Sequence, residues 1–268
     1  MAFLMGPALL FCPADRPDRY AKALERADAV ILDLEDAVAP ARREAARQAL
    51  CGNPLDPGRT IVRINAAGTA DHGPDLAALH RTAYRTVMLA KAESGRDVAG
   101  LGGYQVLALC ETARGILNAA ALAALDNVAG LMWGAEDLVA SLGGTSSRTP
   151  DGSYRDVARH ARSQVLLAAA ARDKPAIDSV YLDIGDVDGL AAEAEDAAAS
   201  GFSAKAAIHP SQAGPIRGAF RPGEEETAYA AALLEAARHE AGVFSFRGRM
   251  VDAPLLRHAE RILRRAGR

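Results

Sequence analysis

The chain is poor in cysteine and aromatic residues, and it has no long run of charge of one sign. Its three cysteines, Cys12, Cys51 and Cys110, are scattered and lack the spacing of a zinc site. An odd, scattered set argues against a secreted domain built on disulfides, so we expect a reducing, cytoplasmic setting. The net charge is −3 without a basic stretch, which gives no indication of nucleic-acid or membrane-surface binding.

Long apolar segments are also missing. Nothing approaches the length of a transmembrane span, and residues 1–7 lack the charged and apolar regions of a signal peptide. We therefore expect no membrane insertion and no signal peptide.

Short β-rich apolar segments alternate instead with alanine-rich helical ones. Half of the 268 residues are hydrophobic, which is enough for a large core. Alternation of this kind predicts βαβ units and a parallel sheet, and eight units favour a closed (β/α)8 barrel. The predicted strands are residues 8–12, 29–34, 60–65, 86–90, 105–110, 129–133, 179–184 and 204–208.

Helical patterns lie between these strands and continue beyond the eighth. The predicted helices of the barrel are residues 17–26, 40–50, 75–80, 96–101, 116–124, 154–172, 190–200 and 212–220. Two more, 224–241 and 255–265, exceed what a minimal barrel needs. We predict a catalytic barrel over residues 1–222 and a helical extension over 223–268, which forms a lid or docks on a neighbouring subunit.

Two of the predicted strands stop abruptly in carboxylates. Residues 106–110 lead into Glu111, and residues 129–133 lead through a glycine to Glu136 and Asp137. The carboxyl ends of barrel strands face one common mouth, where α/β folds place their chemistry. Two carboxylates on neighbouring strands, without paired histidines, are typical ligands of one Mg²⁺ ion. The alternative is that these acidic residues cap the helices that follow.

Other polar residues fall at the same expected strand ends. Arg63 lies inside a buried strand and must be paired, either with an anionic substrate or with Glu35 or Glu111. The cluster of Arg16, Arg19 and Lys22 is equally compatible with a solvated helix face. The full set at the expected mouth is Asp15, Arg16, Asp33, Glu35, Asp36, Arg63, Asn65, Lys91, Glu93, Glu111, Arg114, Glu136, Asp137, Asp183, Asp186 and His209.

An ordered series of short motifs resembles a known family. The chain resembles the citrate lyase beta subunit and the malyl-, citramalyl- and β-methylmalyl-CoA lyases of the HpcH/HpaI aldolase superfamily, and the freestanding citrate lyase beta-like proteins most of all. No single motif decides, but their order is specific. The motifs are LFCPAD at 10–15, LDLED at 32–36, VRIN at 62–65, LAKAE at 89–93, ETARG at 111–115, GAEDL at 134–138, IHPSQ at 208–212 and MVDAP at 250–254.

The resemblance implies a Mg²⁺-dependent TIM barrel that cleaves or forms a carbon–carbon bond beside an acyl thioester. It implies that Glu111 and Asp137 bind Mg²⁺ directly, with Glu111 also facing the substrate, and that Arg63 binds the substrate carboxylate or the oxo-acid oxygen. The residues at positions that contact coenzyme A in the family are Phe11, Arg16 and Lys22.

The resemblance also assigns roles to three acidic residues. Glu35 and Asp36 would orient Arg63 and the waters of the metal. Asp252 matches an acidic residue that reaches into the site of a neighbouring subunit, which implies a homo-oligomer, commonly a trimer. Asp252 is the expected general acid for the enolate, while the base stays open among Asp252, Glu35 and Asp36. We assign no role to Lys91, because Ala90 stands where many relatives have proline.

Three other activities stay open at this point. The chain could be the beta subunit of a multisubunit citrate lyase that acts on a thioester of an acyl-carrier protein. It could be a metal-dependent aldolase of free hydroxy-oxo acids, although the histidine that those relatives carry after an early strand is absent from residues 33–36. A thioesterase is the third. The sequence does not specify the acyl group.

Overall fold

The computed structural model describes residues 5–240 and 242–267, and the chain divides into two compact units between Ile216 and Arg217. This division falls within α10 (Ala213–Phe220). The predicted boundary between residues 222 and 223 falls just after that helix.

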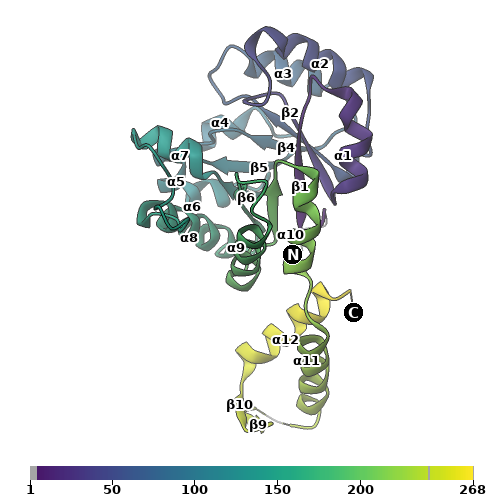
Figure 1. Ribbon diagram of the computed structural model, residues 1–268, viewed down its shortest axis with the longest axis vertical. Coiled ribbons are helices and arrows are strands. Elements are labelled where there is room, and N and C mark those ends of the chain that lie inside the picture. Colours follow the sequence, from purple (N-terminus) through teal and green to yellow (C-terminus); the bar gives the residue numbers. More distant parts are fainter. Residues whose placement is uncertain (1–4, 241, 268) are drawn as a thin grey trace. The chain divides into compact units, whose positions relative to one another are not determined.

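The first unit is a closed barrel of eight parallel strands in sequence order (Figure 1). Pairing of the first strand with the last, with Leu9 beside Ala206, closes the ring. This confirms the (β/α)8 prediction. The strands are β1 (Ala8–Pro13), β2 (Ala29–Asp33), β3 (Thr60–Ile64), β4 (Thr86–Leu89), β5 (Gln105–Cys110), β6 (Val128–Trp133), β7 (Ala176–Asp178) and β8 (Ala204–Ala207).

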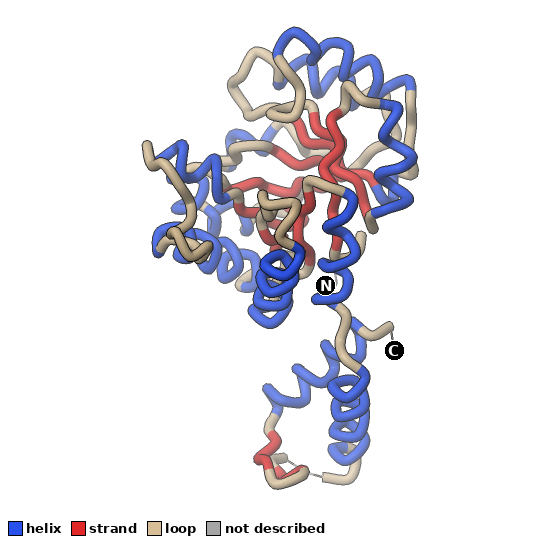
Figure 2. The backbone as a smooth tube through the Cα atoms, viewed as in Figure 1, coloured by secondary structure: helices blue, strands red, loops and turns tan. Residues whose placement is uncertain are grey.

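Helices surround the strands on the outside of the barrel (Figure 2). Short 3-10 turns precede three of them, at Pro17–Arg19 (η1), Pro40–Arg42 (η2) and Pro210–Gln212 (η4), and a fourth, Pro57–Arg59 (η3), precedes β3. The α-helices are α1 (Tyr20–Arg26), α2 (Arg43–Gly52), α3 (His72–Leu79), α4 (Gly95–Ala99), α5 (Ala113–Leu117), α6 (Ala119–Ala123), α7 (Ala135–Leu142), α8 (Asp156–Ala170), α9 (Val187–Ser200) and α10.

Alternate residues of the strands fill the barrel interior, because side chains of a strand point to opposite faces in turn. Continuing the same alternation toward the carboxyl ends brings Phe11, Asp33, Arg63 and Glu111 onto the inner face. The fold thus carries an aromatic ring and three charged groups at one end of an apolar core. The interior cluster comprises Leu9, Ala29, Ile31, Ile61, Met88, Leu107, Leu109, Met132, Ile177, Ala204 and Ala206.

The prediction for the seventh strand is wrong. The strand is Ala176–Asp178, and the predicted segment 179–184 is a connection to α9. Leu182 and Ile184 made that segment resemble a strand, but both side chains are largely exposed. Asp186, expected at the strand end, instead caps α9 by accepting a hydrogen bond from the Gly189 amide.

Three helix predictions also differ from the structure. The predicted helix 116–124 is two short helices, and α7 was not predicted as a helix beyond its possible start at Glu136 and Asp137. The predicted helix 224–241 ends at Ala237. Ala241 lies outside the described residues.

The second unit contains α11 (Glu224–Ala237), the antiparallel pair β9 (Phe244–Phe246) and β10 (Arg249–Val251), and α12 (Ala253–Arg265). It has a small core of its own, made of Ala230, Leu233, Val251, Ala259 and Ile262. In neither unit do the described residues form a helix that is both long and apolar enough to cross a membrane.

A buried charge network supports the β7–β8 side of the barrel. Lys205 is fully buried, and its Nζ donates to Asp178 Oδ2 at 3.0 Å, to Glu193 Oε1 at 2.8 Å and to the Ser179 carbonyl at 2.7 Å. The indole of Trp133 also donates to Asp178, at 2.7 Å. Every donor of the ammonium therefore has a partner, as a buried charge requires.

We predict that Lys205→Met destabilises the protein by about 3 kcal/mol, because Asp178 would keep its buried charge with less compensation. Urea unfolding followed by circular dichroism measures the loss. Arg159→Met is the matched control, since it removes an exposed cation whose one partner among the described residues is Asp156, and it should change stability by less than about 0.5 kcal/mol. Equal effects of the two changes would contradict the prediction.

Candidate active site

An ion pair between neighbouring strands anchors the mouth of the barrel. Asp33 on β2 and Arg63 on β3 are register partners and are joined by two hydrogen bonds, Nε to Oδ1 at 2.7 Å and Nη2 to Oδ2 at 2.5 Å. The Asp33 carboxylate also accepts from the amides of Glu35 and Ala37. Both side chains are buried, so this fork-to-fork pair holds the guanidinium in one orientation.

Two further groups contact the same guanidinium. Glu35 Oε2 lies 3.1 Å from Arg63 Nη1, and the Phe11 ring lies 4.8 Å from the guanidinium carbon. The site thus pairs Arg63 with the nearby acidic residues Asp33 and Glu35, of which the sequence analysis foresaw Glu35. Phe11, expected to contact coenzyme A, supports the cation from the barrel interior.

Glu111 follows β5 immediately and is almost completely buried. Its position is fixed on one side by the Lys91 amide, which donates to Glu111 Oε1 at 3.0 Å. On the other side is Gly134, where an added Cβ would lie 2.7 Å from Glu111 Oε2. A side chain at position 134 would therefore displace the carboxylate, so glycine is required for this close approach.

Asp137 reaches the site from the first turn of α7, the helix that follows β6. Its side chain is one-third exposed, and Lys91 Nζ lies 3.2 Å from its Oδ1. The capping alternative does not hold for Glu136 and Asp137: both lie in the first turn of α7, but its N-cap is Gly134 and no side chain caps the helix. Glu136 accepts a hydrogen bond from Ser147.

Lys91 extends across the mouth among four carboxyl groups. Its Nζ donates to Glu35 Oε1 and to Asp36 Oδ2, the latter at 3.1 Å, and it lies 4.0 Å from Glu111 Oε1. Although burial acts to raise the pKa of Asp36, the hydrogen bond and charge of Lys91 hold it below its ordinary value.

Burial has the opposite net effect on Glu111 and Glu35, two buried carboxyl groups of the mouth. It raises the pKa of Glu111 to about 8, reinforced by the charge of Asp137 and opposed by Arg63 and Lys91. It also raises the pKa of Glu35, against the opposing effects of Arg63 and Lys91. Burial makes an uncompensated carboxylate charge unfavourable at these positions. A bound cation can replace the proton and compensate that charge.

The Glu111 and Asp137 pair fits a hard divalent cation. Among the described residues, neither Glu111 Oε2 nor Asp137 Oδ2 accepts a hydrogen bond, so each carboxylate keeps an oxygen for a ligand. No group of three or more acidic, histidine or cysteine residues within 5–240 and 242–267 is arranged to hold a metal. A cation here would take two protein oxygens and complete its shell with water and substrate, as Mg²⁺ does.

The model of the HpcH/HpaI aldolase/citrate lyase family matches residues 8–210. The chain belongs to this family. A citrate lyase subunit beta-like protein of Mycobacterium tuberculosis is 60% identical over 262 residues, covering 98% of this chain and 96% of the relative. The mitochondrial citramalyl-CoA lyase of Mus musculus is 31% identical over 294 residues, covering 96% of this chain and 84% of the relative.

A solved structure of the family has nearly the same fold. The crystal structure of CitE from M. tuberculosis in complex with magnesium, acetoacetate and coenzyme A superposes with a TM-score of 0.94 at 60% identity, covering 98% of each chain. The resemblance drawn from the ordered motifs is thereby confirmed.

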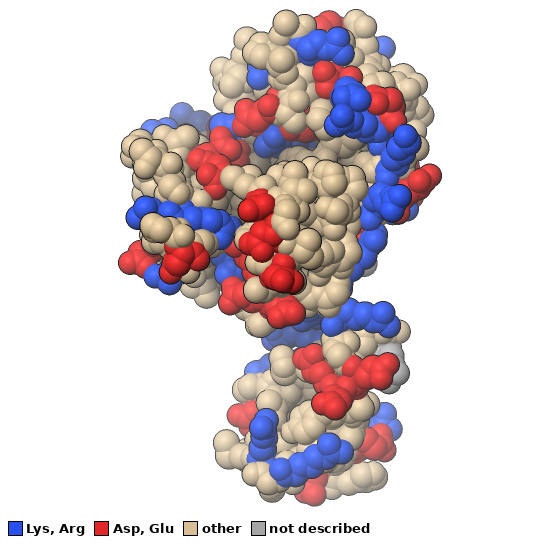
Figure 3. All heavy atoms as spheres, viewed as in Figure 1, with Lys and Arg blue, Asp and Glu red and all other residues tan. Residues whose placement is uncertain are grey.

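Arg16 and Lys22, expected from the family resemblance to contact coenzyme A, lie outside the carboxylate cluster. Arg16 precedes η1 and pairs with Asp18, and Lys22 is exposed on α1. Basic side chains gather along this edge of the barrel unit (Figure 3). Asp252 belongs to the second unit, where it caps α12 by accepting a hydrogen bond from the Leu255 amide. The roles of these residues toward ligands stay predictions.

The sequence analysis placed Asp33 and Lys91 at the expected mouth but assigned neither a role. The contact of Asp33 with Arg63 could have been predicted, because aligning the strand ends of β2 and β3 brings the two residues side by side. The contacts of Lys91 could not, since its reach across the mouth depends on the path of the backbone after β4.

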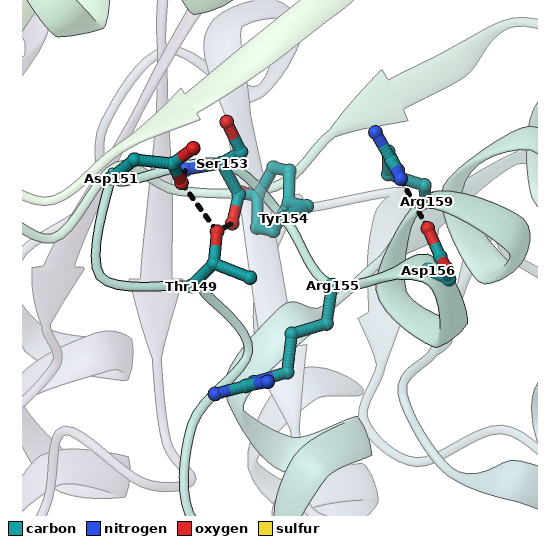
Figure 4. A pocket seen from close by; sticks show the side chains of 7 residues that line it. All are labelled: Thr149, Asp151, Ser153, Tyr154, Arg155, Asp156 and Arg159. Atoms are coloured by element: carbon teal, nitrogen blue, oxygen red, sulfur yellow. Dashed lines mark hydrogen bonds and ion pairs between the residues drawn. The ribbon is translucent and has the colours of Figure 1, made fainter.

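A separate hollow of about 400 Å³ lies at the polar loop before α8, and none of the predicted site residues lines it (Figure 4). Its hydroxyl and charged groups already pair with one another, Thr149 with Asp151 and Asp156 with Arg159. The hollow is lined by Thr149, Asp151, Ser153, Tyr154, Arg155, Asp156 and Arg159.

The raised pKa of Glu111 predicts a pH effect on the metal-free protein. The folded state holds this proton up to about pH 8, whereas an unfolded chain releases it near pH 4.5. The contribution of Glu111 to stability is therefore present below pH 4.5 and is lost as the pH rises toward 8. Glu111→Gln removes this titration, so in EDTA its melting temperature should gain on that of the wild type between pH 5.5 and pH 8.5.

Differential scanning fluorimetry at both pH values measures this gap. Glu93→Gln removes one carboxylate from a less buried position of the same mouth and serves as the control. A gap that stays constant or narrows with rising pH would rule out the proposed protonation of Glu111.

Proposed function

We propose that the protein is a Mg²⁺-dependent lyase that cleaves a 3-hydroxyacyl-CoA thioester into a 2-oxo acid and an acetyl-type thioester. The observation that carries the proposal is the juxtaposition of a buried, ion-paired arginine with two carboxylates that each keep an unpaired oxygen. An anion-binding group beside a cation site suits a substrate that carries a carboxylate next to its hydroxyl. The complex of the M. tuberculosis relative with magnesium, acetoacetate and coenzyme A supports the same chemistry.

In this proposal Arg63 binds the carboxylate of the cleaved portion. Its orientation is set by Asp33 and Glu35, so the guanidinium loses little conformational entropy when the substrate binds. Glu111 and Asp137 would hold Mg²⁺, which supplies Lewis-acid polarisation of the oxygen on C3.

The proposed reaction is a retro-aldol cleavage, in which one proton leaves the C3 hydroxyl and one is added at C2. A base takes the proton of the C3 hydroxyl, the C2–C3 bond breaks, and its electron pair moves into the thioester as an enolate. Glu35, whose pKa is raised by burial, suits the base better than Asp36, whose contact with Lys91 holds its pKa below the ordinary value. Protonation of the enolate at C2 completes the reaction.

We assign that last proton transfer to Asp252 of a neighbouring subunit, which makes the active enzyme a homo-oligomer, most simply a trimer. The observation behind this assignment is that Asp252 lies in a unit with its own core, separate from the barrel. The boundary of that unit is proposed near residue 222. We place the coenzyme A moiety along Phe11, Arg16 and Lys22, where basic side chains meet its phosphates, and the enzyme in the cytoplasm.

The first test is an assay of the pure protein with citramalyl-, malyl- and citryl-CoA, in Mg²⁺ and then in excess EDTA. We expect release of a 2-oxo acid that EDTA abolishes and that added Mg²⁺ restores. Release of free coenzyme A without an oxo acid would identify a thioesterase instead. Turnover only with an acyl-carrier-protein thioester would identify a subunit of a larger lyase, and cleavage of free hydroxy-oxo acids would identify an aldolase.

Substitution of either proposed ligand tests the metal assignment separately. Glu111→Ala and Asp137→Ala should each lower kcat/KM by at least about a thousandfold, because each removes half of the protein's hold on the cation. Circular dichroism should show an intact fold in both variants. Glu136→Ala, in the same turn of α7 but bonded to Ser147, is the matched control and should keep most activity. Retained activity in both ligand variants would overturn the site.

A further inference from the structure

Lys91 has an arrangement that the proposed reaction does not explain. Its ammonium group lies within hydrogen-bond distance of Glu35 and Asp36 and 3.2 Å from Asp137 Oδ1. One cation thus bridges the carboxylates of β2 and α7, on opposite sides of the mouth. Asp137 is also one of the two proposed Mg²⁺ ligands, so the ammonium group and the metal address the same carboxylate.

The backbone is specifically shaped to put the ammonium group there. Lys91 has a φ of +49°, in the left-handed region that costs a residue with a side chain about 1 kcal/mol. In this conformation its amide donates to Glu111 Oε1 while its side chain extends toward Asp137. The two ends of the residue therefore contact both proposed metal ligands, which gives the strained conformation a purpose.

The charge of Lys91 is maintained in this position. A lysine is a cation at neutral pH, and this one has four carboxyl groups within 4.0 Å of its Nζ. A permanent cation is held where a divalent cation is proposed to bind.

We infer that Lys91 is a positioning residue that acts as an internal counter-ion: it neutralises the carboxylates of the mouth in the metal-free protein and competes with Mg²⁺ for Asp137. The inference rests on the proposed function for the identity of the metal. Binding of Mg²⁺ then requires the ammonium group to withdraw from Asp137, while its contacts with Glu35 and Asp36 keep it in the mouth. Lys91 thereby weakens Mg²⁺ binding, and it stabilises the folded protein when no cation is bound.

Two measurable consequences follow from replacing Lys91 by glutamine, which keeps length and polarity without charge. Mg²⁺ should bind about tenfold more tightly or better, because the ammonium group no longer competes for Asp137. In EDTA the variant should melt at a lower temperature than the wild type, and saturating Mg²⁺ should raise its melting temperature by more.

Isothermal titration calorimetry of Mg²⁺ into EDTA-treated, dialysed protein measures the first effect, and scanning fluorimetry with and without Mg²⁺ measures the second. Lys91→Arg keeps the charge and should bind Mg²⁺ within about threefold of the wild type. Arg114→Gln removes a cation of the same strand ends that is paired with Glu93 instead, and it should leave Mg²⁺ affinity unchanged.

The outcomes separate this inference from the proposed function. Unchanged or weaker Mg²⁺ binding by Lys91→Gln, with normal binding by the wild type, would overturn the counter-ion role alone. Equal tightening in Arg114→Gln would also overturn it, because the effect would then be one of overall charge. Absence of Mg²⁺ binding by the wild type would overturn the metal-dependent function itself.

Discussion

Charge balance in the mouth of the barrel is the constraint on which the rest of the site depends. Five carboxyl groups face two cations there, and Asp33, Glu35, Arg63 and Glu111 among them are buried. Like charges at such distances cannot all ionise without compensation. Three features balance these charges: Arg63 is paired with Asp33, the ammonium group of Lys91 is shared among several carboxylates, and burial raises the pKa of Glu111. A divalent cation would supply the remaining positive charge.

The sequence predicts the barrel well because its signals are local and repeated. Apolar runs of strand length end at Asp33, Cys110 and Trp133, and alternation of side chains along each strand carries the next inward position to the mouth. The positions of Glu111 and Arg63 follow from the same rule. Predicting that Glu111 and Arg63 lie near each other required only the alternation of side chains along a strand and the closure of the barrel.

Other features depend on contacts that the sequence does not encode locally. The seventh strand is only three residues long, and its identity is fixed by Asp178, whose partners Lys205 and Trp133 come from other strands. The reach of Lys91 depends on one left-handed residue after β4. Neither the buried contacts of Asp178 nor a positive φ at Lys91 produces a periodic pattern or a biased composition in the sequence, so neither could be predicted from it.

The two halves of the site are built on supports of different stiffness. Arg63 and Asp33 project from paired strands in the wall of the barrel, whereas Asp137 stands on the first turn of the eight-residue helix α7. The proposed anchor for the substrate carboxylate thus rests on two paired strands, whereas one of the two proposed cation ligands rests on a single helical turn. Substitutions in α7 would therefore shift Asp137 without touching the Asp33–Arg63 pair.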